Sequence, residues 1–267
     1  MSVDPRFPQA LIGDEQRQAA AVLTEKTGVP AHDLLVVLGS GLADCLNKWG
    51  EPRASLRLSE LPGVIAPVAD GHKDEVRSYE RGGLNILVAL GRTHLYEGVA
   101  PQTVTALARC AVAAGVRRAV LCNANGCLQQ WNLGDVMAIS DHLNFSGLSP
   151  FDGPLFVDIS QVWDEYLTQE LSRVCQRVGT YALMRGPEYQ TMAESKWLAS
   201  TGADCVGMST IFEAITLHAL GVHVCGMSVV SDLSFASAPT DPSAVVEAAA
   251  RAGATIEAGI EAVIAVS

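Results

Sequence analysis

The sequence lacks the long apolar runs that mark membrane proteins. Although 49% of its 267 residues are hydrophobic, no run of them reaches the roughly 18 residues that a membrane-spanning helix needs. The N-terminal MSVDPRFPQA also lacks the basic and then apolar pattern of a secretory signal. We therefore expect a cytoplasmic protein that has no membrane partner.

Clusters of positive charge are absent as well. The net charge is -11, and no basic cluster is longer than Arg117–Arg118. Nucleic acids and anionic membranes are recognised through many lysines and arginines, so neither is expected as a partner. An acidic protein that binds a small anion has to build a local electropositive pocket for it.

The usual cysteine and metal motifs are missing. None of the seven cysteines forms a CxxC pair, and most lie in apolar segments, which favours buried free thiols in a reducing compartment. The six histidines include no H-x3-H pair and no HExxH motif. We therefore expect no structural metal.

Apolar strands alternate with helical segments from end to end, which is the pattern of an α/β protein. Repeats, low-complexity stretches and Pro/Ser-rich linkers are absent, so residues 1–267 are predicted to form a single domain. The predicted strands are 34–38, 85–90, 119–123, 136–140, 181–184 and 222–230. The predicted helices are 14–28, 101–115, 160–178, 191–200, 211–220 and one that begins at Asp241-Pro242.

Two of these helices begin with a Thr-x-x-Glu capping box, which satisfies free amides of the first turn. The residues are Thr191 with Glu194, and Thr210 with Glu213. Asp241 followed by Pro242 is a second kind of helix start, with a capping side chain and a proline in the first turn.

Several predicted strands end in small or polar residues. The segments are LGSG, GRTH, CNANG, GMST and VVSD. In α/β sheets ligands bind beyond the carboxyl ends of the strands. Five polar strand ends therefore indicate one composite site.

The segment VVLGSGLADCL (36–46) reads as a strand, a glycine turn and a helix start. Gly39 and Gly41 would let the backbone approach a ligand, and backbone amides with the Ser40 hydroxyl could donate to an anion. It is neither a Walker loop nor a G-x-G-x-x-G or G-x-S-x-G motif. A plain tight turn is an equally good interpretation of this segment alone.

The loop GRTHLYEG (91–98) has a denser set of chemical groups. Arg92 and His94 alternate and would share a face in extended backbone. Arginine suits phosphate or carboxylate, and Glu97 could orient or charge His94. His72, in GHKDE, is a second candidate donor. The alternative for the loop is a solvated segment with a surface ion pair.

Two later segments could hold a planar ligand. In GPEYQT, Tyr189 could stack on it and Gln190 could hydrogen-bond to its edge, or the segment is a plain turn. In DCVGMST, Met208 is either a soft apolar wall or core packing, and Ser209 is either an anion ligand or a helix cap. With no strong nucleophile and no cofactor fingerprint, these groups favour chemistry between a substrate and phosphate, organised by electrostatics.

In this order the segments resemble the trimeric, low-molecular-mass class of purine nucleoside phosphorylases. The resemblance covers roughly residues 30 to 235 and includes GRTHLYEG and VGMST, which are specific in combination. The matching stretches are LGSGL (38–42), GH (71–72), GRTHLYEG (91–98), NANG (123–126), SDHLN (140–144), GPEYQTMAE (186–194) and VGMST.FEA (206–214).

The resemblance implies a mixed β-sheet that closes into a distorted barrel flanked by helices, the nucleoside phosphorylase fold, and a homotrimer. It implies phosphorolysis of purine nucleosides to free base and (deoxy)ribose 1-phosphate, with inorganic phosphate as co-substrate and no cofactor. By position it assigns phosphate binding to Ser40, His72, Arg92, His94, the Ala124 amide and Ser209. It assigns ribose binding to Tyr96 and Met208, base binding to Tyr189, Gln190, Val206 and Asp232, and catalysis to His94 and Asp232.

The base pocket departs from the family pattern at two positions. Where 6-oxopurine enzymes of the family carry Glu, this chain has Gln190, and where they carry Asn, it has Asp232. Gln190 can donate to an unprotonated N1, and Asp232 can accept from a 6-amino group or, when protonated, donate to N7. We therefore predict a preference for 6-aminopurine (adenosine-type) nucleosides.

Other readings stay open at this stage. They are an ordinary inosine/guanosine phosphorylase, a non-catalytic nucleoside-binding relative, and a nucleoside hydrolase, which the phosphate residues and the lack of an aspartate cluster disfavour. TDPSAVVE (240–247) lacks the histidine by which the family contacts the 5'-hydroxyl. A 5'-deoxy or 5'-thio nucleoside is therefore a conceivable substrate. Asn125 and Cys127 replace smaller residues common in the family.

Overall fold

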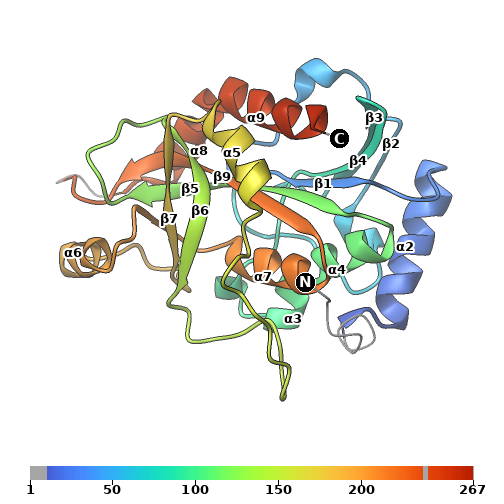
Figure 1. Cartoon of the computed structure of the whole chain (residues 1–267), viewed down its shortest axis with the longest axis horizontal. Coiled ribbons are helices and arrows are strands. Elements are labelled where there is room, and N and C mark those ends of the chain that lie inside the picture. The colour runs from blue at the N-terminus through green and yellow to red at the C-terminus, as the bar shows by residue number, and fades with distance from the viewer. Residues whose placement is uncertain (1–10, 237–239, 267) are drawn as a thin grey trace.

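The computed structural model describes residues 11–236 and 240–266; the N-terminal segment considered above lies outside them. The chain forms one mixed β-sheet with helices on both sides (Figure 1). The strands are β1 (Leu34–Val37), β2 (Ala54–Leu56), β3 (Val76–Arg81), β4 (Leu84–Ala89), β5 (Arg118–Cys127), β6 (Val136–Asn144), β7 (Arg177–Leu183), β8 (Cys205–Gly207) and β9 (His223–Leu233). The strand order is β2-β3-β4-β1-β5-β8-β7-β6-β9.

The second half of the sheet closes on itself. β5 pairs with β8 and also, in parallel, with β9 at the far end of the order, so five strands form a barrel. The first half stays open, with β2 at its edge. It contains the β3–β4 hairpin, whose turn residues Gly82 and Gly83 both have positive φ. Such a two-glycine turn matches the twist of a hairpin. The predicted α/β class and the distorted barrel are confirmed.

Helices cover both faces of the sheet (Figure 1). The helices are α2 (Asp14–Thr27), α3 (Pro101–Val104), α4 (Ala106–Ala113), α5 (Glu165–Ser172), α6 (Met192–Ser200), α7 (Ile211–Ala219), α8 (Pro242–Arg251) and α9 (Gly253–Ala265). β1 shows the layering: Leu35 and Val37 pack in the core that includes α2, α4 and α7, whereas Leu34 and Val36 pack in the core that includes α5, α8 and α9. A parallel strand buried on both faces reads as a continuous apolar run, as LLVV does.

The predicted helix over 160–178 is wrong in extent. Trp163 forms a bridge with Val224, the Asp164 carboxylate accepts from the Leu167 amide and starts α5 there, and β7 already begins at Arg177. Pairing of Arg177 and Val178 with β6 takes the last residues of that window out of the helix. Sheet pairing overrides local helix preference here.

The helix predicted over 101–115 is interrupted. Thr105 separates α3 from α4, and its hydroxyl donates to the carbonyls of Pro101 and Gln102, both at 3.3 Å. A threonine side chain that competes for backbone carbonyls commonly disturbs a helix. β2 and β3 were not predicted at all. In β3 the charged residues of RSYER interrupt the apolar pattern by which a strand is recognised.

Three strands continue through the polar segments that were predicted to follow them. β5 extends through CNANGC, β6 through SDHLN and β9 through SDL. Asp232 therefore lies inside a strand, paired in register with Gly126 across a bulge at Asn125/Gly126. Because neighbouring strands satisfy these backbone groups, polar side chains can line the interior of the sheet without leaving the backbone unpaired.

Candidate active site

The polar strand ends meet around one cavity of about 570 Å³. It lies where β1, β4, β5, β8 and β9 end, and it is closed on one side by the start of α8. All twelve residues predicted for phosphate, ribose and base line it: Ser40, His72, Arg92, His94, Tyr96, Ala124, Tyr189, Gln190, Val206, Met208, Ser209 and Asp232. The composite site expected from the strand ends therefore forms.

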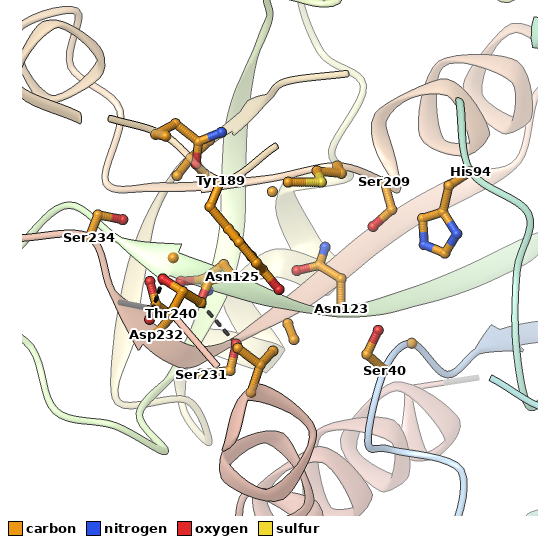
Figure 2. Close-up of a pocket in the computed structure, with 18 of the residues that line it drawn as sticks. Ser40, His94, Asn123, Asn125, Tyr189, Ser209, Ser231, Asp232, Ser234 and Thr240 are labelled. Atoms are coloured by element: carbon orange, nitrogen blue, oxygen red, sulfur yellow. Dashed lines mark hydrogen bonds between the residues drawn. The ribbon is translucent and has the colours of Figure 1, made fainter. Parts of the chain in front are cut away.

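The cavity has two chemically distinct ends. Figure 2 shows Ser40, His94 and Ser209 on one side and Asp232, Thr240 and Ser234 on the other, with Tyr189 between them in this view. We call these the anion end and the base end.

Ser40 and His72 form one unit of the anion end. The Arg92 amide donates to His72 Nδ1 at 3.1 Å, so the ring proton sits on Nε2, which donates to Ser40 Oγ at 3.0 Å. Burial, with smaller contributions from His94 and Arg92, lowers the pKa of His72 from 6.5 to about 2. A neutral His72 that donates to Ser40 leaves the Ser40 hydroxyl proton free for a ligand.

Close backbone packing holds this unit in place. A Cβ on Gly39 would lie 2.8 Å from the Cys122 carbonyl oxygen and 3.0 Å from Asn123 Cα. Only a glycine therefore lets the turn after β1 approach β5 this closely.

Arg92 is buried at the wall of the anion end. Its Nη1 donates to the Cys122 carbonyl at 2.6 Å, and its Nε lies 2.9 Å from Glu213 Oε2 in an ion pair. Nη2 has no hydrogen-bond partner among the described residues. A buried, unpaired guanidinium nitrogen beside a cavity points to an anionic ligand.

Glu213 is the residue whose role the sequence analysis missed. The predicted Thr210/Glu213 capping box does not form, because Thr210 has φ 77° and makes no side-chain cap. The Glu213 carboxylate forms an ion pair with Arg92 instead. The Thr191/Glu194 box and the Asp241 cap are present as predicted, with Glu194 N donating to Thr191 Oγ1 and Ser243 N to Asp241 Oδ1.

His94 is fixed by a second buried carboxylate. Glu97 Oε1 accepts from the His94 amide at 2.8 Å and lies 2.9 Å from Nδ1, which leaves Nε2 as the free ring nitrogen. Tyr96 stacks on the His94 ring with centroids 4.6 Å apart, and His72 meets it edge-on at 4.8 Å. Burial raises the pKa of the Tyr96 phenol, so it stays a neutral hydrogen-bond donor in the cavity wall.

A buried hydrogen-bond network connects Asn123, Thr210 and Ser209. Asn123 Nδ2 donates to Thr210 Oγ1 at 2.8 Å, and Ser209 and Thr210 hydroxyls lie 3.1 Å apart. Thr210 is the only described non-glycine residue with positive φ. Ser209 lines the cavity while Thr210 stays buried against Asn123, and backbone strain of this kind is held by surrounding contacts.

The base end is built on the paired strands β5 and β9. Asp232 Oδ1 accepts from the Thr240 hydroxyl at 3.1 Å. Its carboxylate lies above Gly126, where an added Cβ would be 3.7 Å from Oδ2 and 2.8 Å from Ser234 Oγ. The pKa of the half-exposed Tyr189 is raised by burial and then by the negative charges of Asp232 and Asp241.

Asn125 adds a buried acceptor to this end. Its Nδ2 donates to Ser228 Oγ at 2.7 Å, and Ser228 in turn donates to Asn123 Oδ1. Asn125 Oδ1 has no partner among the described residues. The chain Asn125–Ser228–Asn123–Thr210 therefore connects the two ends of the cavity through the barrel interior.

The remaining walls are apolar. Met208 packs on Gly186, where any side chain would clash with the Met208 sulfur, and Val206 is buried in β8. Met192 and Val245 also line the cavity. Val245 lies near the start of α8, within the segment that lacks the expected histidine.

Sequence reasoning did not assign roles to Asn123, Ser228, Thr240, Met192 or Val245. The alternation of Asn123 and Asn125 within CNANG was the one available signal, since residues two apart in a strand share a face.

Within residues 11–236 and 240–266 there is no cluster of three or more metal-binding side chains. All seven cysteines are free thiols, as predicted, and five of them are buried. No described helix is both long and apolar enough to cross a membrane.

Comparison with known proteins agrees with the geometry. The phosphorylase superfamily profile matches residues 35–265. A Mycobacterium bovis purine nucleoside phosphorylase is 41% identical over 222 residues, with 82% of each chain covered. A Cellulomonas purine nucleoside phosphorylase is 40% identical over 252 residues, which cover 91% of this chain and 89% of the relative.

Solved structures show the same fold. Isoform 2 of purine nucleoside phosphorylase from Schistosoma mansoni, in complex with cytosine and ribose-1-phosphate, has a TM-score of 0.87 at 26% identity and covers 97% of this chain and 98% of its own. Another Schistosoma mansoni purine nucleoside phosphorylase, in complex with adenosine, has a TM-score of 0.86 at 24% identity, with 96% and 98% covered.

Proposed function

The chain belongs to the purine nucleoside phosphorylases of the phosphorylase superfamily, and on that premise we propose that it prefers 6-aminopurine (adenosine-type) nucleosides. The observation that carries this proposal is the Asp232 carboxylate in the wall of the base end. We propose inorganic phosphate as the co-substrate, with no further cofactor.

The two edges of the purine decide the preference. Adenine presents a 6-amino donor and an unprotonated N1, whereas hypoxanthine presents the O6 acceptor and an N1–H donor. The Gln190 amide has both a donor and an acceptor, so it can serve either base. An ionised Asp232 can only accept, so it matches the 6-amino group and opposes O6.

The expected size of the preference for adenosine over inosine follows from the cost of leaving buried polar groups unpaired. A buried polar group left without a partner costs about 1–3 kcal/mol. Asp232 already accepts one hydrogen bond from Thr240, and opposite O6 its carboxylate would gain no further donor. We therefore expect adenosine to be favoured over inosine by about tenfold or more in kcat/KM.

The anion end suits the attacking phosphate. Ser40, His72, Arg92, His94, the Ala124 amide and Ser209 would bind it beside the sugar, which Tyr96 and Met208 contact. As the C1'–N9 bond breaks, its electron pair stays on the purine and the sugar gains oxocarbenium character. The phosphate anion stabilises that cation and then forms the new bond to C1', which gives ribose 1-phosphate.

The base end suits the leaving group. Negative charge that builds on the purine spreads over its ring nitrogens, and the Gln190 amide can donate to N1. Tyr189 would stack on the ring. Ribose-1-phosphate, which is bound in the Schistosoma mansoni isoform 2 structure, is the kind of product that this arrangement would release.

A phosphorolysis panel tests the preference. Adenosine, inosine, guanosine and 5'-methylthioadenosine are incubated with the enzyme and inorganic phosphate, and release of free base is followed. We expect adenosine-type substrates to have the highest kcat/KM. A clear preference for inosine or guanosine would overturn the proposal and leave an ordinary 6-oxopurine phosphorylase.

The same panel separates the other classes. Omitting phosphate must abolish base release, because a nucleoside hydrolase would still release base without phosphate. A non-catalytic relative would release no base even when phosphate is present. The methylthio substrate tests the apolar Val245 wall as a 5' contact. The homotrimer and the cytoplasmic location implied by the resemblance remain predictions.

A further inference from the structure

Glu213 and Arg92 form a buried ion pair directly behind the anion end. Their side chains are only 4% and 2% exposed, and Glu213 Oε2 lies 2.9 Å from Arg92 Nε. Neither of these two atoms has an aligned hydrogen bond among the described residues. Charge attraction rather than hydrogen-bond geometry therefore holds the pair together.

The other groups of the anion end carry little net positive charge when no ligand is bound. His72 accepts the Arg92 amide proton and is neutral. His94 faces the Glu97 carboxylate at 2.9 Å. Arg92 is thus the permanent cation among the side chains of this end, and Glu213 forms an ion pair with it.

Removing one partner of a buried pair leaves an uncompensated charge in a medium of low dielectric constant. An anion in the cavity would replace part of the lost negative charge. The same carboxylate repels that anion, because like charges a few ångströms apart in a protein interior interact strongly.

We propose that Glu213 is a positioning residue for phosphate: it holds Arg92 at the cavity wall and balances its charge while the site is empty. The balance weakens phosphate binding and thereby lets the sugar phosphate product leave. This inference rests on the proposed function, since it concerns the phosphate of that reaction.

The test variant is Glu213→Gln, which keeps the shape and removes the charge. Without the opposing carboxylate we expect the Kd for inorganic phosphate to fall by about tenfold. The phosphate KM should fall as well, and kcat should fall several-fold because ribose 1-phosphate is released more slowly. A lower KM together with a lower kcat is a result that a merely structural role would not give.

Thermal unfolding gives a second readout. Without phosphate, Glu213→Gln should lower Tm by roughly 5–10 °C, because Arg92 is left buried and unpaired. Phosphate should raise Tm more in this variant than in the wild type, because the anion then neutralises Arg92.

Asp135→Asn is the matched control. Asp135 pairs with Arg177 at 2.9 Å in a partly buried ion pair that does not line the cavity. This variant should lower Tm without changing the Kd for phosphate or the shift that phosphate causes.

The outcomes separate the inference from the function on which it rests. Equal or weaker phosphate binding by Glu213→Gln, with the same loss of Tm with and without phosphate, would overturn the inference and leave phosphorolysis intact. Failure of the wild type to bind phosphate and to require it for base release would overturn the proposed function. If the variant is recovered only in phosphate buffer, the inference is supported. If it is recovered in neither buffer, Glu213 has only a structural role.

Discussion

At the scale of single residues, the proposed base preference depends on Asp232. It stands inside β9 with one oxygen bonded to Thr240 and the other above Gly126, and Asn125 adds an unpaired acceptor nearby. A carboxylate acceptor at this end suits a base that presents a donor.

We expect Asp232→Asn to shift the ratio of kcat/KM for inosine over adenosine upward by about 10–100-fold, because the new amide can donate to O6. Steady-state kinetics with both nucleosides measures the ratio. Thr240→Val is the control, since it removes the donor to Asp232 and keeps the carboxylate. An unchanged ratio in Asp232→Asn would mean that this side chain does not contact the 6-position.

At the scale of the elements, the site depends on how closely the turn after β1 approaches β5. The turn carries Ser40, and β5 carries Asn123 and the Cys122 carbonyl that receives Arg92. A small displacement of this turn would move the Ser40–His72 unit and Arg92 together.

Gly39→Ala should therefore destabilise the protein by about 1–3 kcal/mol, because the new Cβ meets backbone atoms that cannot move aside. It should also raise the phosphate KM. Chemical denaturation and kinetics measure the two effects. Gly253→Ala, at the start of α9, is the control, because a Cβ added there would come no closer than 3.3 Å to another atom, the Cβ of Cys45. Equal destabilisation by both changes would contradict the argument.

At the scale of the whole molecule, an acidic protein with a net charge of -11 gathers the proposed phosphate-binding groups around one buried arginine. The Glu213 carboxylate lies beside Arg92, and the Glu97 carboxylate lies beside His94. The same burial makes the fold sensitive to acid.

Burial lowers the pKa of His72 to about 2 and that of His32 to about 4, both from 6.5. Below pH 6.5 the unfolded chain binds protons that the folded chain does not, so stability is complete above that pH and falls as the pH drops. Each histidine should cost roughly 1 kcal/mol per pH unit between 6.5 and its folded pKa.

Thermal unfolding between pH 7.5 and 5 in phosphate-free buffer measures this dependence. We expect Tm to be nearly constant above pH 6.5 and to fall below it. His32→Gln, which changes a histidine outside the cavity that contacts Ser78, should make the fall shallower. A Tm that does not change between pH 7 and 5 would contradict neutral burial of these rings.

The sequence by itself determined the α/β class, most strand and helix positions, and the twelve side chains that line one cavity. The class and the element positions come from local signals: apolar periodicity, glycine turns and polar strand ends. The full set of twelve comes from the resemblance to purine nucleoside phosphorylases, which adds Tyr96, Ala124 and Val206 to the residues that the strand ends indicate. The tertiary structure alone decided that β9 runs past Asp232, that residues 173–178 leave the predicted helix, and that Glu213 pairs with Arg92 rather than caps a helix. Each of these depends on a partner distant in the chain, and local propensity carries no information about such a partner.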